Sequence, residues 1–339
     1  MMKLALMKRF FETLSPEWRS PLLDEIAAPW VSGSADVRFW RASANFVAFV
    51  DRPAGKFVLR FNHESERTAA GTMAELEVVN ALNARGMRAA RPVASIAGRL
   101  VESVPTAQGV FHAVMFERLP GQVLGFDTLD PAGFERWGRV VGQVHHASQG
   151  LWVAGRPGWD DWLAGFRRDV APQETLAWRE LEAVESALRA LPAAEDSYGL
   201  IHYDLELDNL IWEGDAPGLC DFDDCGSHWY AADIAFALRD LFSDSAARVN
   251  FKDERLLAFL SGYRAVREIA PAQLQLIPLF LRFHNLVSFA RITRSLGEGP
   301  QAGEPGWLDD LRLRLVSILE RLRQDFAAHP LHSLHPAAG

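Results

Sequence analysis

The sequence predicts an α+β protein built as two lobes, in which an antiparallel sheet precedes a mostly helical region. Three observations lead to this prediction. Apolar residues alternate with period two in several segments between residues 37 and 117, and they recur at spacings of three and four after residue 130. At residues 199–242, three short apolar runs alternate with acidic clusters. We place the lobe boundary near residue 118, with an N-terminal lobe at 1–118 and a C-terminal lobe at 119–339.

Composition narrows the classes of function. The chain has 339 residues, 49% of them hydrophobic, which is enough to build a full core in two lobes. A formal net charge of −9 argues against nucleic acid or an anionic membrane as the main partner. The N-terminal residues MMKLALMKRFFETL lack the apolar stretch of a signal peptide, and no run of about 18 apolar residues occurs. We expect a soluble cytoplasmic protein.

The N-terminal lobe is predicted to contain one or two short helices, a sheet and one longer helix. Residues 3–30 hold the short helices, with Ser15-Pro16 and Ser20-Pro21 as start signals. A helix is predicted at Thr72–Arg85, before Gly86. The five strands of an antiparallel sheet are predicted at Val37–Arg41, Asn45–Val50, Lys56–Phe61, Pro92–Val104 and Gly109–Glu117, with a tight turn at Ala97-Gly98.

The C-terminal lobe is predicted to be helical around the central stretch. Asp130-Pro131 opens a helix that ends near Gly150, and further helices are predicted at 172–191, 254–268, 272–296 and 305–327. Adjacent helix positions point about 100° apart, so His145-His146 indicates core packing more than a metal site. Prolines in the tail argue against a regular helix that would align His329, His332 and His335.

The stretch at 199–242 carries the residue types that phosphoryl transfer needs. Asp204, in a His202-x-Asp204 pattern, supplies a carboxylate that can accept the proton of an attacking hydroxyl. Asn209 and Asp221 supply oxygens suited to Mg²⁺, which prefers few protein ligands plus phosphate oxygens. Asp223 is a further candidate for a metal ligand or braces the loop.

Two other features of this stretch have simpler interpretations. Asp233 precedes apolar residues at helical spacing, so it is either an N-cap or a brace for the catalytic loop. Cys220 and Cys225 lack the second half of a zinc site, and we expect buried thiols in a reducing compartment.

The order of these motifs resembles the catalytic core of the aminoglycoside phosphotransferase family, which is related to choline and homoserine kinases. The family pattern H-G-D-L-x-x-x-N, then D-x-D, then D-[IL]-A reads here as residues 202–209, Asp221-Phe222-Asp223 and Asp233-Ile234-Ala235. The chain departs from it at Tyr203, where the family usually has Gly, and at Glu206, where it often has His. Both departures flank the proposed base, so they bear on the identity of the acceptor.

The resemblance implies a two-lobed protein-kinase-like fold with ATP and Mg²⁺ in the cleft. It implies transfer of the γ-phosphoryl group of ATP to a hydroxyl of a small molecule, such as an amino alcohol, an aminoglycoside or a homoserine-like compound. A protein or stress-response kinase of the same fold, or a nucleotide-binding pseudokinase regulator, stays open at this point.

The resemblance also implies roles in the N-terminal lobe. A strand cation meets the phosphates and a helix-borne Glu positions it: we assign Arg60 and Glu75, with Lys56 and Glu77 as alternatives. The loop at 41–45 covers the phosphates but contains no glycine, so the side chains of Ser43 and Asn45 are candidate substitutes for backbone cradling. The hinge between the lobes brings Phe116, Glu117 and Leu119 beside the nucleotide.

The remaining assignments concern support and the acceptor. His202 and Asp233 are expected to support the catalytic loop. Five residues are candidates for the acceptor pocket, with ordinary packing as the alternative for the aromatic and helical ones: Glu206, Trp229, Tyr230, Arg282 and His284.

Overall fold

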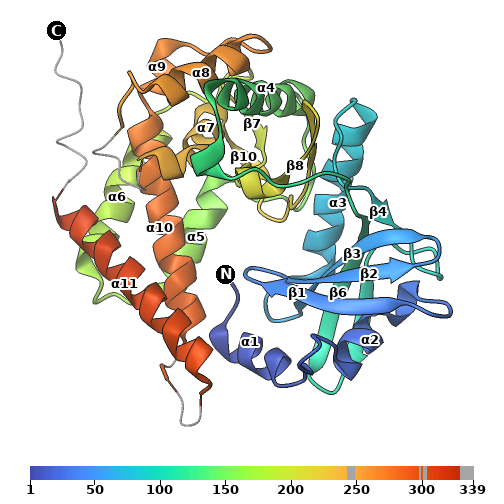
Figure 1. Cartoon of the computed structure of the whole chain (residues 1–339). Helices are drawn as coiled ribbons and strands as arrows, with labels where there is room; N and C mark the ends of the chain where they lie inside the picture. Colours follow the sequence, from blue (N-terminus) through green and yellow to red (C-terminus); the bar gives the residue numbers. More distant parts are fainter. Residues whose placement is uncertain (243–248, 298, 301–303, 329–339) are drawn as a thin grey trace, which may run out of the picture.

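A computed structural model describes residues 1–242, 249–297, 299–300 and 304–328. The chain forms two lobes (Figure 1). One contains a twisted sheet with helices against it, and the other is mostly helical. The histidines of the tail predicted to be irregular, His329, His332 and His335, lie outside the described residues.

The sheet of the first lobe is antiparallel and has six strands in the order β1-β2-β3-β6-β4, with β5 also pairing with β6. Its strands are β1 (Asp36–Ala42), β2 (Phe46–Arg52), β3 (Gly55–His63), β4 (Pro92–Val93), β5 (Glu102–Thr106) and β6 (Gly109–Glu117). Five strands were predicted, and the sixth arises because the segment 92–104 is interrupted by a turn at Ser95–Arg99. The turn includes Gly98 at φ +78°, where a residue without Cβ is favoured.

Two helices at the N-terminus cover one face of the sheet. They are α1 (Leu4–Phe11) and α2 (Pro21–Ala27). Phe10 packs against Phe39, Phe46 and Phe61 of the strands, so aromatic burial fixes α1 on the sheet. Ser20 caps α2 as predicted, since its hydroxyl accepts from the amide of Leu22. The other predicted start signal, Ser15-Pro16, is wrong: a turn follows it, not a helix.

The helix α3 (Ala69–Ala84) connects the two lobes. Leu76 packs against Val114 and Phe116 of the sheet. Val78, Val79 and Leu82 belong instead to the large core of the second lobe. Because one helix contributes to both cores, α3 sets how the sheet sits on the helical lobe.

The second lobe is a helical bundle around two short strand pairs. Its helices are α4 (Pro131–Ser148), α5 (Trp159–Asp169), α6 (Thr175–Arg189), α7 (Tyr230–Ala237), α8 (Glu254–Arg264), α9 (Pro271–Leu274), α10 (Ile277–Leu296) and α11 (Gly306–Ala328). The helix α4 begins as predicted, with the Asp130 carboxylate accepting from Gly133 N at 2.7 Å. The helix α5 was not predicted; its eleven residues contain a glycine and five charged side chains that weaken the apolar periodicity.

The short strands hold the central stretch of the sequence. β7 (Tyr198–Ile201) pairs with β10 (Gly226–Trp229), and β8 (Leu210–Glu213) pairs with β9 (Ala216–Leu219). The catalytic-loop residues 202–209 therefore connect one pair to the other. Residues 220–225 return between them, so the loops of both segments meet at one edge of the lobe.

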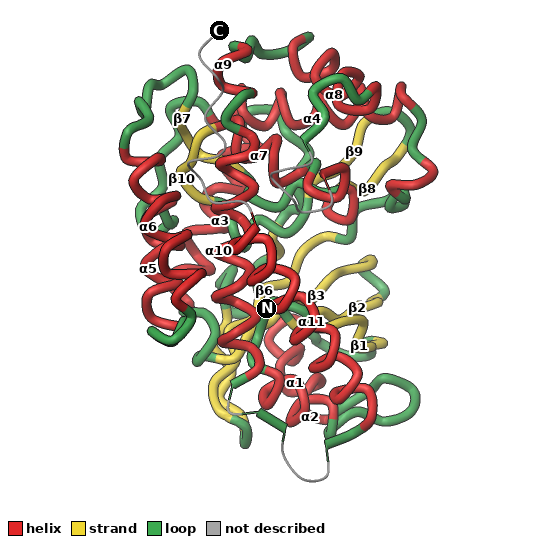
Figure 2. The backbone as a smooth tube through the Cα atoms, turned by 90° about the vertical axis from the view of Figure 1, so that its left-hand side faces the viewer, coloured by secondary structure: helices red, strands yellow, loops and turns green. Residues whose placement is uncertain are grey.

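The N-terminal segment packs against the last two helices of the described chain, α10 and the start of α11. Figure 2 shows α1 beside α11, and the rings of Phe11 and Trp307 lie 4.7 Å apart. Arg294 of α10 reaches the carbonyl of Met1 at 2.9 Å. None of the described helices is long and apolar enough to cross a membrane.

Candidate active site

A cleft of about 310 Å³ lies between the lobes. Its roof is the outer face of β1–β3, its back is the hinge after β6, and its floor is the β8–β9 region with the segment that follows. The side chains that line it include Val47, Phe49, Val58, Arg60, Phe116, Leu119, Ile211, Leu219 and Asp221. Apolar walls with a few charged groups at one end are typical of a site for a small ligand.

The charged end of the cleft opens into a second pocket of about 160 Å³, here called the catalytic pocket. The two cavities share Arg41, Asp208 and Asp221. Six carboxylates line the catalytic pocket: Asp204, Glu206, Asp208, Asp221, Asp223 and Asp224. The pocket therefore brings together residues of the catalytic loop and of the Asp221-Phe-Asp segment.

The predicted ion pair between strand and helix forms. Arg60 donates to both oxygens of Glu75, at 2.8 and 2.5 Å, and to Asp221 at 3.2 Å. Burial opposes the charge on Arg60, but Glu75 and then Asp221 raise its pKa. The alternatives, Lys56 and Glu77, are both exposed. Because strand β3, helix α3 and the loop after β9 each supply one group, this triad forms only when the lobes are together.

The predicted base and the predicted amide ligand are in direct contact. The Asn209 amide donates to the carbonyl of Asp204 at 2.7 Å and to its carboxylate at 3.1 Å. The other carboxylate oxygen of Asp204 accepts from Arg239 at 3.1 Å. The Asp204 side chain is about one-third exposed, so an acceptor molecule can reach it from the catalytic pocket.

Asp233 anchors the start of the catalytic loop. It lies inside the first turn of α7, where Trp229 is the N-cap, so the N-cap interpretation is wrong. Its carboxylate accepts from the backbone amides of His202 and Tyr203, at 3.1 and 2.8 Å, and from His145 at 2.9 Å. Burial works against the charge, but these hydrogen bonds, that from His145 first, lower the pKa of Asp233.

This anchor holds a strained backbone. Tyr203 has φ +75°, a conformation that residues with a Cβ rarely adopt. Such strain persists only where the surroundings over-determine it. His202 is fully buried, and its ring contacts the carbonyl of Cys220 at 3.1 Å, which connects the catalytic loop to the segment after β9. The two predicted support residues thus lie at the base of the loop.

Two carboxylates of the segment after β9, those of Asp221 and Asp223, differ in how fully arginines engage them. Asp221, at φ +62°, has one oxygen at Arg60, and burial raises its pKa. Asp223 accepts from Arg67 at 2.7, 3.0 and 3.2 Å. Burial acts in the other direction, but Arg67 holds the pKa of Asp223 well below its usual range.

The Asn45 side chain is engaged at both ends. Its amide donates to Asp223 at 3.4 Å, and its carbonyl accepts from Asn62. It is also buried. Asn45 lines the catalytic pocket, and these contacts brace its loop against Asp223; that its side chain replaces a glycine-rich backbone around the phosphates stays a prediction. Ser43 is exposed and lines the catalytic pocket.

The predicted hinge residues line the cleft. Phe116, Glu117 and Leu119 are all in contact with the cavity, and the Phe116 ring also lies 5.3 Å from the Arg60 guanidinium. The isopropyl group of Leu119 packs on Gly218, where any Cβ would come within 2.8 Å of it. That close approach places β9 directly under the hinge.

Of the five candidates for the acceptor pocket, the structure brings only Glu206 into the catalytic pocket. It forms an ion pair with Arg239, and burial raises its pKa to about 8. His284 is half-buried and lines neither cavity, with its ring 6.1 Å from that of Tyr203. Arg282 is buried and paired with Glu180, away from both cavities.

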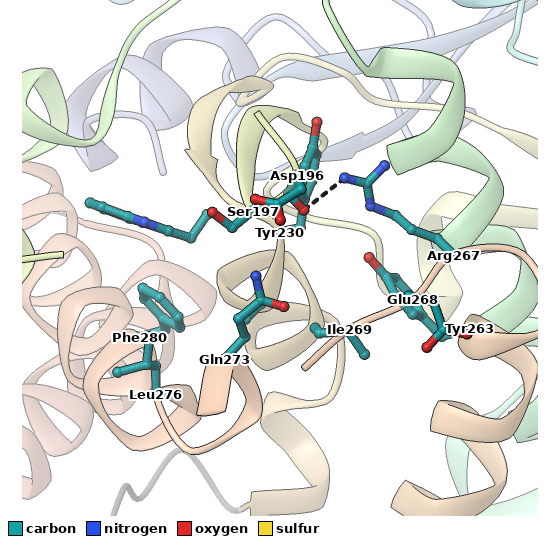
Figure 3. A pocket seen from close by; sticks show the side chains of 12 residues that line it. Asp196, Ser197, Tyr230, Tyr263, Arg267, Glu268, Ile269, Gln273, Leu276 and Phe280 are labelled. Atoms are coloured by element: carbon teal, nitrogen blue, oxygen red, sulfur yellow. Dashed lines mark hydrogen bonds between the residues drawn. The ribbon is translucent and has the colours of Figure 1, made fainter. Parts of the chain in front are cut away.

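Trp229 and Tyr230 are also elsewhere. Both are buried, and they line a small cavity on the other side of α7 together with Tyr263 and Arg267. Figure 3 shows Tyr230 beside Asp196, Ser197 and Arg267, with a hydrogen bond of 2.9 Å from Arg267 to the carbonyl of Asp196. The cavity measures about 10 Å³, the space of one water molecule, so it holds no acceptor.

Several residues of the site were missed from the sequence. Arg67, Arg239 and Arg291 each pair with a carboxylate of the catalytic pocket, at Asp223, Asp204 and Asp224 respectively. Arg156 donates to the carbonyls of Gly71, Asp223 and Cys225. These arginines lie up to 156 residues from their partners, so no local pattern could have indicated the pairs.

The donor set fits a divalent cation. Because the Asn209 amide nitrogen donates to Asp204, its carbonyl oxygen is turned to the opposite side, near the Cys220 sulfur at 4.0 Å. Asp221 has one oxygen at Arg60, and its side chain lines the catalytic pocket. An amide oxygen and a carboxylate oxygen are ligands that Mg²⁺ accepts alongside phosphate oxygens.

Comparison with known proteins agrees with this geometry. A family model described as "Phosphotransferase enzyme family" matches residues 37–269. The amicoumacin kinase of Bacillus subtilis (strain 168) is 28% identical over 281 residues, which are 79% of this chain and 83% of that protein.

Solved structures of related kinases share the fold. A structure described as "Amicoumacin kinase hAmiN in complex with AMP-PNP, Ca2+ and Ami" superposes with a TM-score of 0.74 at 22% identity, over 96% of this chain and 99% of that one. A microcompartment-associated aminopropanol kinase gives 0.68 at 23% identity, over 92% and 98%. Since the family match covers well over half of its residues, the chain belongs to the phosphotransferase enzyme family and has the two-lobed kinase-like fold.

Proposed function

We propose that this phosphotransferase moves the γ-phosphoryl group of ATP to a hydroxyl of a small molecule, with Asp204 as the general base. The observation that carries the proposal is the meeting of Asp204, Asn209 and Asp221 in one pocket that opens into an apolar cleft. The apolar cleft suits a nucleobase, and the acidic pocket suits the reacting groups. In this arrangement the hinge residues Phe116, Glu117 and Leu119 lie beside the nucleobase of ATP.

Each group has a distinct task in this mechanism. Asp204 accepts the proton of the acceptor hydroxyl. At the same time the hydroxyl oxygen forms a bond to the γ-phosphorus, and the bond between the γ-phosphorus and the β–γ bridging oxygen breaks, so that ADP leaves. Arg60, positioned by Glu75, places a fixed positive charge in the roof of the cleft against the phosphates. Asn209 and Asp221 would hold Mg²⁺, which neutralises charge on the phosphate oxygens. We assign Asp223 to bracing, because Arg67 engages both of its oxygens.

The charge of the pocket supports an acceptor that carries an amine. Six carboxylates line a space of about 160 Å³, and Arg41 is the sole cationic side chain among the described residues that line it. Five of the six pair with arginines that do not themselves line the pocket, and among the described residues Asp208 forms no ion pair. A cationic group on the acceptor would be attracted into such a pocket. The names of the similar proteins, amicoumacin kinase and aminopropanol kinase, are in line with this class. We propose an amino alcohol or a larger amine-bearing alcohol.

The test is release of ADP from Mg-ATP across a panel of amino alcohols, aminoglycosides, homoserine-like amino acids and neutral sugars. We expect turnover with at least one amine-bearing alcohol and loss of that turnover in Asp204→Asn. A hit confined to neutral sugars would exclude the amine class. Turnover that is undiminished in Asp204→Asn would remove Asp204 from the base role.

A further inference from the structure

The loop expected to cover the phosphates of ATP lacks the glycine-rich turn that often binds them. Residues 41–45, which are the end of β1 and the turn into β2, contain no glycine. Backbone amides in a glycine-rich turn are one common cradle for phosphates. Asn45 is engaged with Asn62 and Asp223. Another group in this loop must therefore meet the terminal phosphate, and Arg41 is the charged one.

A bulge in β1 turns Arg41 toward the cleft. The pairing of β1 with β2 runs from Phe39 opposite Ala48 to Arg41 opposite Val47, so Trp40 is the extra residue. Without it, Arg41 would share the inner face with Val37 and Phe39, which are buried in the core. Bulges commonly re-aim a side chain next to an active site. Here the bulge places both Trp40 and Arg41 on the cleft side, where they line the cavity.

The register then aligns Arg41 with the other phosphate cation. Arg41 pairs with Val47, and Val47 pairs with Arg60 on the next strand. Directly paired residues point to the same face of a sheet, so the two arginines stand in one row, two strands apart. Two strand spacings are roughly 10 Å, about the reach of a triphosphate between them.

Arg41 also differs from the other arginines around the site, because its charge is not paired with a carboxylate of the described residues. Arg60, Arg67, Arg239 and Arg291 are each paired with a carboxylate. Within the described part of the chain, the Arg41 side chain makes no hydrogen bond or ion pair, and it is exposed. It lines both the nucleotide cleft and the catalytic pocket, at their junction.

We propose that Arg41 is a catalytic residue that contacts the γ-phosphoryl group of bound ATP and stabilises its charge during transfer. It would act as an arginine finger supplied by the chain itself, in the place of a glycine-rich loop. The proposal rests on the proposed use of ATP in the cleft. A planar guanidinium can donate two hydrogen bonds to neighbouring phosphoryl oxygens, and its charge is matched to an anion that spreads over them in the transition state.

Comparing the affinities for Mg-ADP and Mg-AMP-PNP distinguishes a contact with the γ-phosphate from a contact with the rest of the nucleotide. Dissociation constants are measured for Mg-ADP and for Mg-AMP-PNP with the wild-type chain, Arg41→Gln, Arg41→Lys and Arg38→Gln. Arg38 lies on the same strand but pairs with Asp36 and lines neither cavity, so Arg38→Gln is the matched control. We expect Arg41→Gln to bind Mg-AMP-PNP about tenfold more weakly, or worse, and Mg-ADP within twofold of wild type.

Turnover provides the second readout. We expect kcat of Arg41→Gln to fall by about 10²–10⁴, somewhat below the full range for arginine fingers because Arg60 and the metal remain. Arg41→Lys should recover part of this loss, since it keeps the charge but not the fork. Thermal unfolding checks that each variant is folded.

The outcomes are separable from those of the acceptor panel. Both nucleotides bind without an acceptor, so a panel without a hit would remove the amine class and leave the affinity comparison intact. Equal weakening of Mg-ADP and Mg-AMP-PNP in Arg41→Gln, or unchanged affinity and turnover, would overturn the role of Arg41.

Discussion

Asp204 is held at both of its oxygens, by Asn209 on one side and Arg239 on the other. These contacts orient the carboxylate toward the pocket without closing it. In Asp204→Asn the side chain keeps its size, so the cleft and its nucleotide contacts should be preserved. We expect nucleotide affinity within about threefold of wild type and a turnover lower by about 10²–10⁴, the usual contribution of a general base.

The measurement is single-turnover phosphoryl transfer together with equilibrium binding of Mg-ADP. A matched variant is Asp127→Asn, an exposed carboxylate in a short helical turn outside both cavities. Weak binding by Asp204→Asn would indicate that Asp204 has a mainly structural role.

Asp233 links stability to pH. Its folded pKa is lowered below the ordinary value of 3.8, so the unfolded chain binds its proton first as the pH falls. The stabilisation is therefore complete above about pH 4 and is lost as the pH falls through the folded pKa. Asp233→Asn removes a charged acceptor from two buried amides and from His145, and we expect the free energy of unfolding at pH 7 to fall by about 2–4 kcal/mol.

Chemical denaturation at several pH values tests this. The difference between wild type and Asp233→Asn should shrink as the pH falls below about 4, because the wild-type carboxylate becomes protonated as the pH passes through its lowered folded pKa. A difference that stays constant over this range would mean that the charge of Asp233 contributes nothing to stability.

At the scale of the helices, α4 and α8 pack with almost no space between their backbones. A Cβ on Gly138 would lie 1.8 Å from the carbonyl oxygen of Phe259, and one on Gly262 would lie 1.8 Å from that of Glu135. Each glycine therefore permits the approach of the facing helix. Because α4 also carries His145, which contacts Asp233, this packing positions the support of the catalytic loop.

We expect Gly138→Ala to lower the free energy of unfolding by about 2–4 kcal/mol, since the clash is with backbone and cannot relax by a side-chain rotation. Gly165→Ala is the matched control: it is also inside a helix, but its Cβ would meet nothing closer than the end of Arg168 at 3.6 Å. That control should gain up to about 1 kcal/mol from helix propensity. Urea denaturation of both variants measures the difference, and equal effects would contradict the packing account.

The sequence allowed prediction of elements and residues wherever the signal was local. The pair Arg60 and Glu75 follows from strand and helix periodicity together with the kinase-like order of the motifs. The phosphotransferase activity and the fold class are confirmed. The lobe boundary near residue 118 and the roles of individual site residues remain predictions.

What was missed depends on distant packing. The bulge at Trp40 breaks the alternation by a single residue, which looks in the sequence like the end of a strand. Arg291 meets Asp224 across 67 residues, and only the placement of α10 brings them together. The acceptor candidates Trp229, Tyr230 and Arg282 were wrongly placed because aromatic and polar residues on buried elements look alike whether they face a pocket or a core.

At the scale of the whole molecule, the lobes are joined by arginines that cross between them. Arg60 connects the sheet to Asp221, and Arg67 connects the segment before α3 to Asp223. Arg156 reaches from the second lobe toward the first. It lies between α4 and α5 and donates to the carbonyl of Gly71 in α3 at 3.2 Å, as well as to the carbonyls of Asp223 and Cys225. The same short segment after β9 thus receives contacts from both lobes.

This arrangement predicts that loosening the joint affects both stability and nucleotide binding. Arg156→Gln removes a charged donor from three backbone carbonyls, and we expect the free energy of unfolding to fall by about 2–4 kcal/mol. The KM for Mg-ATP should rise several-fold, because Asp221 and Arg60 meet only when the lobes are correctly set.

Arg255→Gln, which breaks an exposed pair with Asp253, should change stability by less than about 1 kcal/mol and leave the KM for Mg-ATP unchanged. Saturating Mg-ADP should restore about 2.7 kcal/mol at 100 times its Kd, since nucleotide bound between the lobes stabilises the closed arrangement. Equal loss of stability in the two variants, or an unchanged KM in Arg156→Gln, would show that Arg156 does not set the position of the lobes.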